Sequence, residues 1–178
     1  MQARGPLMIE HRLIEQMIAV IQRRLDRAVQ AQSIDPSFID TAVDFIRVYA
    51  DRTHHGKEED ILFRTLRGKD LSDEHQRIMN ELMDEHALGR ETTKALVEAN
   101  NRYRKREIGA LAEVTDRLKT LVAFYPRHIK KEDAVFFPAA LEYLTEQEDQ
   151  AMLAEFWEFD RKMIHEKYQA IVKGFARE

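Results

Sequence analysis

Residues 54–63 of this chain read HHGKEEDILF, and residues 128–137 read HIKKEDAVFF. Each stretch contains His-x-x-x-Glu, a spacing that in a helix brings the imidazole and the carboxylate to one face, one turn apart. Two shorter stretches repeat as well, because residues 7–11 read LMIEH and residues 82–86 read LMDEH. The chain therefore repeats polar residues that carry chemistry, and not only apolar residues that pack.

The order of these motifs predicts the fold. His11 precedes His54 by 43 residues and His86 precedes His128 by 42, so each half of the chain carries one His and then His-x-x-x-Glu at a matching separation. Each half is then a helical hairpin, and two hairpins packed about a pseudo-two-fold axis form a four-helix bundle. The predicted fold class is all-α, an up-down-up-down four-helix bundle built from two repeated hairpins, with an extra C-terminal helix.

Apolar residues recur at helical spacing along almost the whole chain, which predicts long helices joined by short loops. Asp35 suits the N-cap of the second helix and Pro36 its first position. Thr145 and Glu148 form a capping-box signature before the fifth helix. The expected helices cover about residues 6–31, 36–66, 71–100, 107–143 and 146–175. We expect a single domain over residues 1–178, with the bundle within about 6–143.

Composition excludes several classes of protein. Lys and Arg number 28 and Asp and Glu number 32, so the net charge of −4 offers no basic field for nucleic acid or an anionic membrane. The absence of cysteine excludes disulfides, thiolate nucleophiles, iron–sulfur clusters and Cys-type zinc sites. No apolar run approaches the roughly 20 residues of a membrane span, and no signal sequence precedes the first helix. The expected location is the cytoplasm.

The repeated polar residues predict a metal site inside the bundle. His11 and His86 have apolar flanks and should face inward, as should the two His-x-x-x-Glu pairs. The interior would then hold four imidazoles and two carboxylates, from His11, His54, Glu58, His86, His128 and Glu132. Burying such groups without partners costs roughly 2–7 kcal/mol each, and a bound metal pair removes that cost. One such His or pair alone is typical of a hydrogen-bonded core or a surface, but the repeated set favours metal.

The donor types narrow the choice of metal. Imidazole and carboxylate ligands without thiolate suit iron, manganese or zinc in a binuclear site. No clear ferritin-like pair of Glu-x-x-His motifs occurs. The zinc-protease pattern His-Glu-x-x-His is also missing, because Gln169 stands where the second His after His165 would be.

Over about residues 6–140 these motifs resemble those of the hemerythrin-like proteins, the HHE cation-binding domain family. The resemblance implies a bundle around a non-haem centre of two iron ions, with Glu58 and Glu132 as the bridging carboxylates. It divides the ligands into two sets, His11, His54 and Glu58 for one iron and His86, His128 and Glu132 for the other. Asp133 is the alternative bridge, since the oxygen carriers use a five-residue step from His to Asp.

The chain departs from the oxygen carriers at one position. They have a second His four residues after the third-helix His, where this chain has Arg90. His165 would supply the missing ligand if the fifth helix folds back over the bundle end; otherwise it is a partly exposed residue of a surface helix. His55 turns about 100° from His54 on an α-helix and pairs by spacing with Glu59, so we expect it beside the site or at the surface; the alternative is that it is a metal ligand.

Other residues are expected to support the site or to lie away from it. His75 is about three turns from His86 and should lie at the surface. Five aromatic residues are expected to line the core near the site, as ordinary bundle packing in the first place and, as the alternative, to keep the metals dry: Tyr49, Phe63, Phe124, Phe136 and Phe137. Three more are expected to dock the fifth helix onto the bundle: Phe156, Trp157 and Phe159.

The resemblance implies a metal-binding protein whose binuclear iron centre binds or senses a small oxidant, dioxygen first and nitric oxide or peroxide next. An enzyme of the di-iron oxidase or peroxidase type is a second hypothesis. A third is an iron-responsive interaction module, and a bundle filled with structural zinc is a fourth. The expected partner is a small molecule rather than nucleic acid or a membrane, and a protein partner is not indicated.

Overall fold

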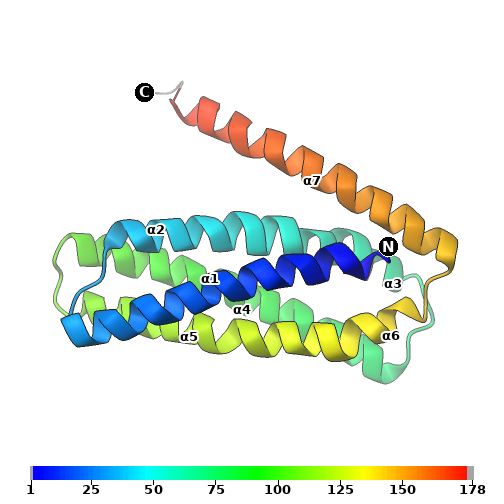
Figure 1. Cartoon of the computed structure of the whole chain (residues 1–178), viewed down its shortest axis with the longest axis horizontal. Helices are drawn as coiled ribbons and strands as arrows, with labels where there is room; N and C mark the ends of the chain where they lie inside the picture. The colour runs from blue at the N-terminus through cyan, green and yellow to red at the C-terminus, as the bar shows by residue number, and fades with distance from the viewer. Residues whose placement is uncertain (1, 176–178) are drawn as a thin grey trace.

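A computed structural model of the chain describes residues 2–175, with the side chains of 164–166 and 168–175 left out. Within that part the chain is helical and has no strand (Figure 1). None of the helices described there is long and apolar enough to cross a bilayer.

The first hairpin consists of α1 (Arg4–Ala31) and a long second helix. The second helix begins as α2 (Pro36–Asp44), continues through the π-helical segments η1 (Phe45–His55) and η2 (Glu58–Phe63), and ends as α3 (Arg64–Leu66). The Asp35 side chain accepts a hydrogen bond from the Ser37 N–H at 2.9 Å, which confirms the predicted N-cap.

The second hairpin repeats this plan. It consists of α4 (Asp73–Arg104) and a helix that runs through α5 (Ala110–Lys131), the π-helical segment η3 (Glu132–Phe136) and α6 (Phe137–Leu141). Figure 1 shows the two hairpins side by side, with α4 against α5, α1 against α5, and α2 against α4. The all-α bundle predicted from the repeat is confirmed.

The apolar core of the bundle is divided into two clusters. One cluster surrounds Ile21 and Leu118, and the other surrounds Phe63 and Leu82. Along α1, for example, the chain passes from Leu7 in the second cluster to Ile14 in the first, and His11 lies between them. The polar residues of the repeat therefore lie between two dry layers.

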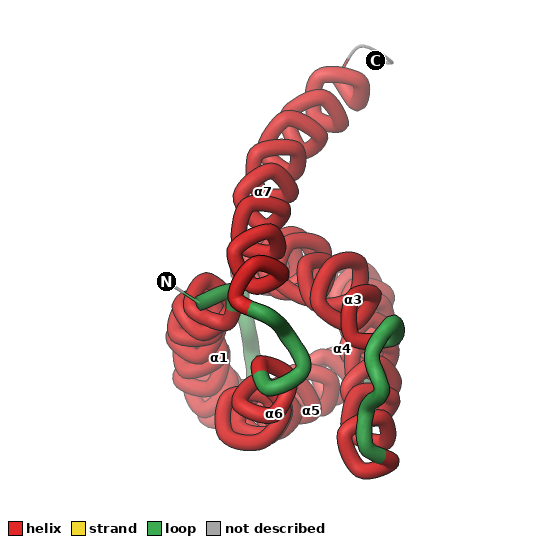
Figure 2. Tube along the Cα trace, turned by 90° about the vertical axis from the view of Figure 1, so that its right-hand side faces the viewer, coloured by secondary structure: helices red, strands yellow, loops and turns green. Residues whose placement is uncertain are grey.

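The last helix, α7 (Glu146–Phe175), leaves the end of the bundle, contacts η1 and η2, and then diverges from the bundle (Figures 1 and 2). The Thr145 hydroxyl accepts from the Glu148 N–H at 3.2 Å, and the Glu148 carboxylate accepts from the Thr145 N–H at 2.8 Å. The predicted capping box is thus confirmed.

The packing of α7 differs in one residue from the prediction. Phe156 is buried, and Phe159 lies so close to Gly56 that a Cβ there would meet its ring at 2.8 Å. Trp157 is 60% exposed, so the prediction that it docks the helix is wrong. Trp157 follows Phe156 on an α-helix, so its side chain is rotated about 100° from that of Phe156 and faces away from the bundle.

Candidate metal centre

Four imidazoles and two carboxylates meet between the two apolar clusters. None of their side chains is more than 2% exposed, and they come from both hairpins: His11, His54, Glu58, His86, His128 and Glu132. Both glutamates open a π-helical segment, Glu58 at the start of η2 and Glu132 at the start of η3. Such segments are frequent at functional sites. The prediction that these six side chains face the interior is confirmed.

Each carboxylate faces imidazoles of both hairpins. The two oxygens of Glu58 lie 3.4 Å from His54 Nε2 and 3.4 Å from His86 Nε2. The two oxygens of Glu132 lie 3.1 Å from His11 Nε2 and 3.3 Å from His128 Nε2. Each glutamate therefore lies between a His of one hairpin and a His of the other, which is the position of a bridging ligand.

Two groups of donor atoms are close enough for each to hold one cation, with all atoms of a group within 4.8 Å of one another. The first group is His11, His54, Glu58 and Glu132; the second is His55, His86 and His128. The first agrees with the predicted first ligand set and adds Glu132. In the second group His55 joins the predicted pair of imidazoles.

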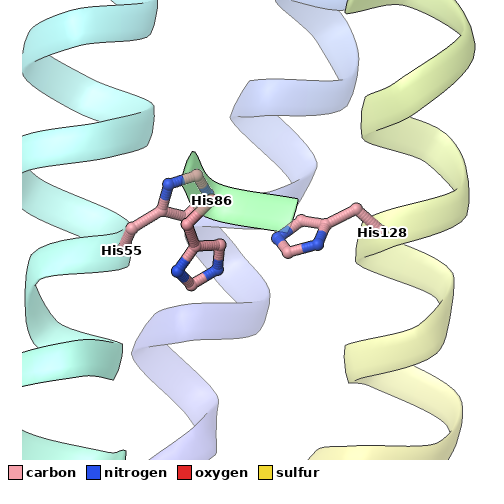
Figure 3. A group of neighbouring side chains, drawn as sticks. All are labelled: His55, His86 and His128. Atoms are coloured by element: carbon pink, nitrogen blue, oxygen red, sulfur yellow. The ribbon is translucent and has the colours of Figure 1, made fainter. Parts of the chain in front are cut away.

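Of the positions predicted for His55, the structure shows the one beside the site and not the one at the surface. The His55 side chain is 2% exposed, and its ring stacks on His86 with centroids 3.9 Å apart and planes 8° from parallel (Figure 3). The expectation that it pairs with Glu59 is wrong, because Glu59 contacts His86 and Arg90. A π-helix has more residues per turn than an α-helix, so His54 and His55 on η1 diverge by less than 100° and both reach the interior.

A ring of outer carboxylates holds the four imidazoles in place. Each imidazole Nδ1 lies 2.7–2.9 Å from one of them, in the pairs His11–Asp133, His54–Glu10, His86–Glu59 and His128–Glu85. An Nδ1–H that donates to a carboxylate leaves the Nε2 lone pair free and directed inward. This ring fixes the tautomer that a metal requires.

The sequence repeats contain a signal for this ring that the predicted ligand set does not use. Glu10 directly precedes His11 and Glu85 directly precedes His86, while Glu59 follows Glu58 in the same way that Asp133 follows Glu132. Asp133, the predicted alternative bridge, has its oxygens on His11 Nδ1 and Arg12, so it faces outward.

Each outer carboxylate is in turn paired with a cation, in the pairs Asp133–Arg12, Glu10–Lys57, Glu59–Arg90 and Glu85–Lys131. Burial alone would raise the pKa of Glu59, but the hydrogen bonds from His86 and Arg90 lower it to about 2. Glu59 is therefore charged at neutral pH, and hydrogen bonds from His128 and Lys131 lower the pKa of Glu85 in the same way against the effect of burial, whereas burial raises the pKa of Glu10. Arg90, which replaces a carrier ligand, thus belongs to the outermost layer of the site.

The inner imidazoles and carboxylates shift one another's pKa values when no cation lies between them. Burial and the negative charge of Glu132 raise the pKa of Glu58 well above its ordinary value. Although burial opposes it, the carboxylates of Asp133 and Glu132 raise the pKa of His11 to about 9. Burial and the neighbouring His86 lower the pKa of His55 to about 3. Cations between the carboxylates would relieve the repulsion between Glu58 and Glu132.

The inner atoms also lack partners. Among the described residues, the Nε2 atoms of His11, His54, His86 and His128 and all four oxygens of Glu58 and Glu132 are buried without a hydrogen bond. Buried polar groups in proteins are otherwise almost always satisfied. Two cations would satisfy them together, and nitrogen and oxygen donors without thiolate suit iron, manganese or zinc. The residues present therefore fit a metal pair.

Aromatic rings enclose the centre. Phe137 stacks on His11 with centroids 5.6 Å apart, Phe63 on His86 at 6.0 Å and Phe124 on His128 at 5.1 Å. Phe136 is buried and packs on Phe63, as expected. Tyr49 is half-buried and stacks on Phe45.

A cavity of about 80 Å³ lies between η1 and α4 and reaches the centre. Its wall includes Asp51, Arg90 and Tyr125, and at its inner end it reaches His55 and His86. Water occupies roughly 30 Å³ per molecule in the liquid, so the cavity suits a molecule of a few atoms.

Two histidines of the chain remain, His75 and His165. His75 is half-buried near the start of α4, with its Nδ1 2.7 Å from the Tyr143 hydroxyl, so it lies apart from the centre as expected. The side chain of His165 lies outside the described residues, and its role as a ligand stays a prediction.

Comparison with known proteins agrees with this geometry. The family model of the hemerythrin HHE cation binding domain matches residues 6–140, a range that contains all the inner histidines and glutamates named above. No curated protein and no solved structure matches the chain.

Proposed function

This chain belongs to the hemerythrin HHE cation-binding domain family, and we propose that its bundle holds two iron ions that bind or sense dioxygen or a related small oxidant, nitric oxide or peroxide. The observation that carries the proposal is the set of buried nitrogen and oxygen atoms without partners between the two hairpins. The proposed ligands are His11, His54, Glu58, His86, His128 and Glu132.

Glu58 and Glu132 would each join the two ions. Both carboxylates have one oxygen toward each hairpin's imidazoles. Two shared carboxylates bring two cations close together and neutralise part of their charge. Two iron ions held in this way could supply two electrons to a small molecule, one from each iron.

The bound iron pair would supply the redox chemistry and the coordination position for the oxidant. The chain's own residues hold that pair in a fixed and dry place. The outer carboxylates orient the imidazoles, and Phe63, Phe124 and Phe137 cover their faces. The cavity beside Tyr125 gives a molecule of a few atoms a path toward the centre.

The same ligand set is compatible with other metals and other functions, which experiments can distinguish. Manganese or zinc would satisfy the same donors. An oxidase or peroxidase would use the centre for turnover rather than binding. An iron-responsive module would use the loss of metal, since a bundle without cations leaves its buried donors unsatisfied.

The test is purification without oxygen, followed by metal analysis and by absorption spectra before and after oxygen is admitted. We expect two irons per chain and new charge-transfer bands that appear with oxygen. A stable adduct reversed by removing oxygen supports binding, and steady consumption of peroxide or oxygen with a reductant supports an enzyme. Zinc, or no metal, in protein that is folded and supplied with iron would contradict the proposal.

A further inference from the structure

His55 has no part in the proposed set of six ligands, although it lies in the same interior. Its side chain is 2% exposed, and both of its ring nitrogens are buried without a hydrogen bond. An imidazole always carries at least one N–H donor, and a neutral one also carries an acceptor. A buried His with neither nitrogen satisfied is costly unless a ligand occupies one of them.

The ring of His55 lies where a metal ligand would lie. One of its nitrogens falls within 4.8 Å of ligand atoms of both His86 and His128. Figure 3 shows the rings of His55 and His86 one above the other, with His128 facing them from the opposite helix. The three rings come from η1, α4 and α5.

Asp51 is the carboxylate that faces the His55 ring, at Nδ1, which leaves Nε2 without a partner. Asp51 Oδ1 lies 3.5 Å from His55 Nδ1, and Arg90 binds that same oxygen at 2.7 Å. Glu59 is held by His86 and Arg90. Arg90 points outward to these carboxylates, so α4 offers the second group of donors no nitrogen besides His86.

The geometry points to His55 as a third imidazole ligand of the metal held by His86 and His128. This inference rests on the proposed metal pair. The matching position of the second hairpin is Ile129, which is buried and has no donor atom. The two metals therefore differ, with three imidazoles on one and two, His11 and His54, on the other.

X-ray absorption of the iron-loaded protein tests the inference, because it counts the imidazoles around the metals. The wild-type protein should show five imidazoles per metal pair, a count that requires no variant. His55→Ile places the residue of the second hairpin in the first and should remove one imidazole. It should also weaken binding of the second metal at least tenfold in competition with a chelator. His75→Gln, which removes a histidine outside the centre, should change neither result.

A wild-type count of four imidazoles per metal pair would overturn the inference. So would a His55→Ile protein with an unchanged count and affinity, even if small molecules then reached the centre at a different rate, because His55 would be only a wall of the cavity. His55→Gln, which retains a polar side chain, guards against a variant that fails to fold. Wild-type protein without two metals would instead contradict the proposed function, so the two failures are distinguishable.

Discussion

The two hairpins present the same polar residues at matching positions but do not have the same surroundings. Glu10 and His11 match Glu85 and His86, and His54, Lys57 and Glu58 match His128, Lys131 and Glu132. The first hairpin differs in two ways: η1 makes it π-helical as far as His55, and α7 packs against it.

These differences affect residues that the repeat itself would make equivalent. Lys57 is fully buried between Glu10 and Asp160 of α7, whereas Lys131 is 29% exposed. The residue after the helix His is His55 in the first hairpin and Ile129 in the second. Positions that agree are those that the proposed metal pair would use, and positions that differ would make its two halves unequal.

The largest effect on metal binding is expected from variants that remove the carboxylates facing both hairpins. Glu58→Gln and Glu132→Gln should each abolish binding of two metals, because each carboxylate faces imidazoles of both hairpins. Metal content after dialysis against iron measures the effect, with the exposed Glu98→Gln as control. The bridging assignment would fail if both inner variants kept two metals per chain.

Metal removal should weaken both hairpins alike. The unsatisfied buried donors cost about 1–3 kcal/mol each, and about 1 kcal/mol corresponds to 2–4 °C in Tm at this chain length. We therefore expect chelation to lower Tm by at least about 10 °C, followed by circular dichroism. Hydrogen exchange should rise around His11 and His86 to a similar degree. An apoprotein as heat-stable as the metal-loaded form would argue against a role of metal in stability.

Lys57 and Lys131 occupy matching positions, and replacing each of them should show how the stabilities of the two hairpins differ. Lys57→Met leaves Glu10 and Asp160 without their buried cation and should cost about 3–5 kcal/mol. Lys131→Met breaks a partly exposed pair and should cost less than about 1 kcal/mol. Urea unfolding of the metal-free proteins measures both without any contribution from metal affinity. Equal costs would mean that α7 does not bury Lys57 in solution.

The outer carboxylates should show the same inequality on a smaller scale. Glu10→Gln and Glu85→Gln keep an acceptor for Nδ1 but remove the charge, and loss of such partners typically weakens metal binding by about 10–100-fold. The loss should be larger for Glu10, whose side chain is 10% exposed, than for Glu85, which is 28% exposed. Chelator competition gives both affinities, and a larger loss for Glu85→Gln would reverse the expected order.

The sequence was sufficient to predict the bundle and the six inner residues, because both follow from apolar periodicity and from a repeat of polar residues at fixed separation. It was not sufficient for His55. An α-helical rotation of 100° per residue predicts that the two neighbouring histidines face different directions, whereas on the π-helical η1, where the rotation per residue is smaller, His54 and His55 are both buried. That change of backbone register arises where helices pack around the centre, and local sequence does not encode it plainly.

The outer ring shows a second limit of sequence reasoning. Glu10 holds the ring of His54 rather than that of its neighbour His11, and Asp133 holds His11 across the bundle. The repeat shows that these acidic residues are duplicated. Only the arrangement of helices shows which imidazole each one reaches.

The most direct test of the metal pair is a crystal structure of protein prepared without oxygen, with anomalous diffraction measured at the iron edge. The account predicts two iron peaks inside the bundle, one beside His11 and His54 and one beside His86 and His128, with the Glu58 and Glu132 carboxylates shared between them. A single peak, or iron found only outside the bundle, would contradict it.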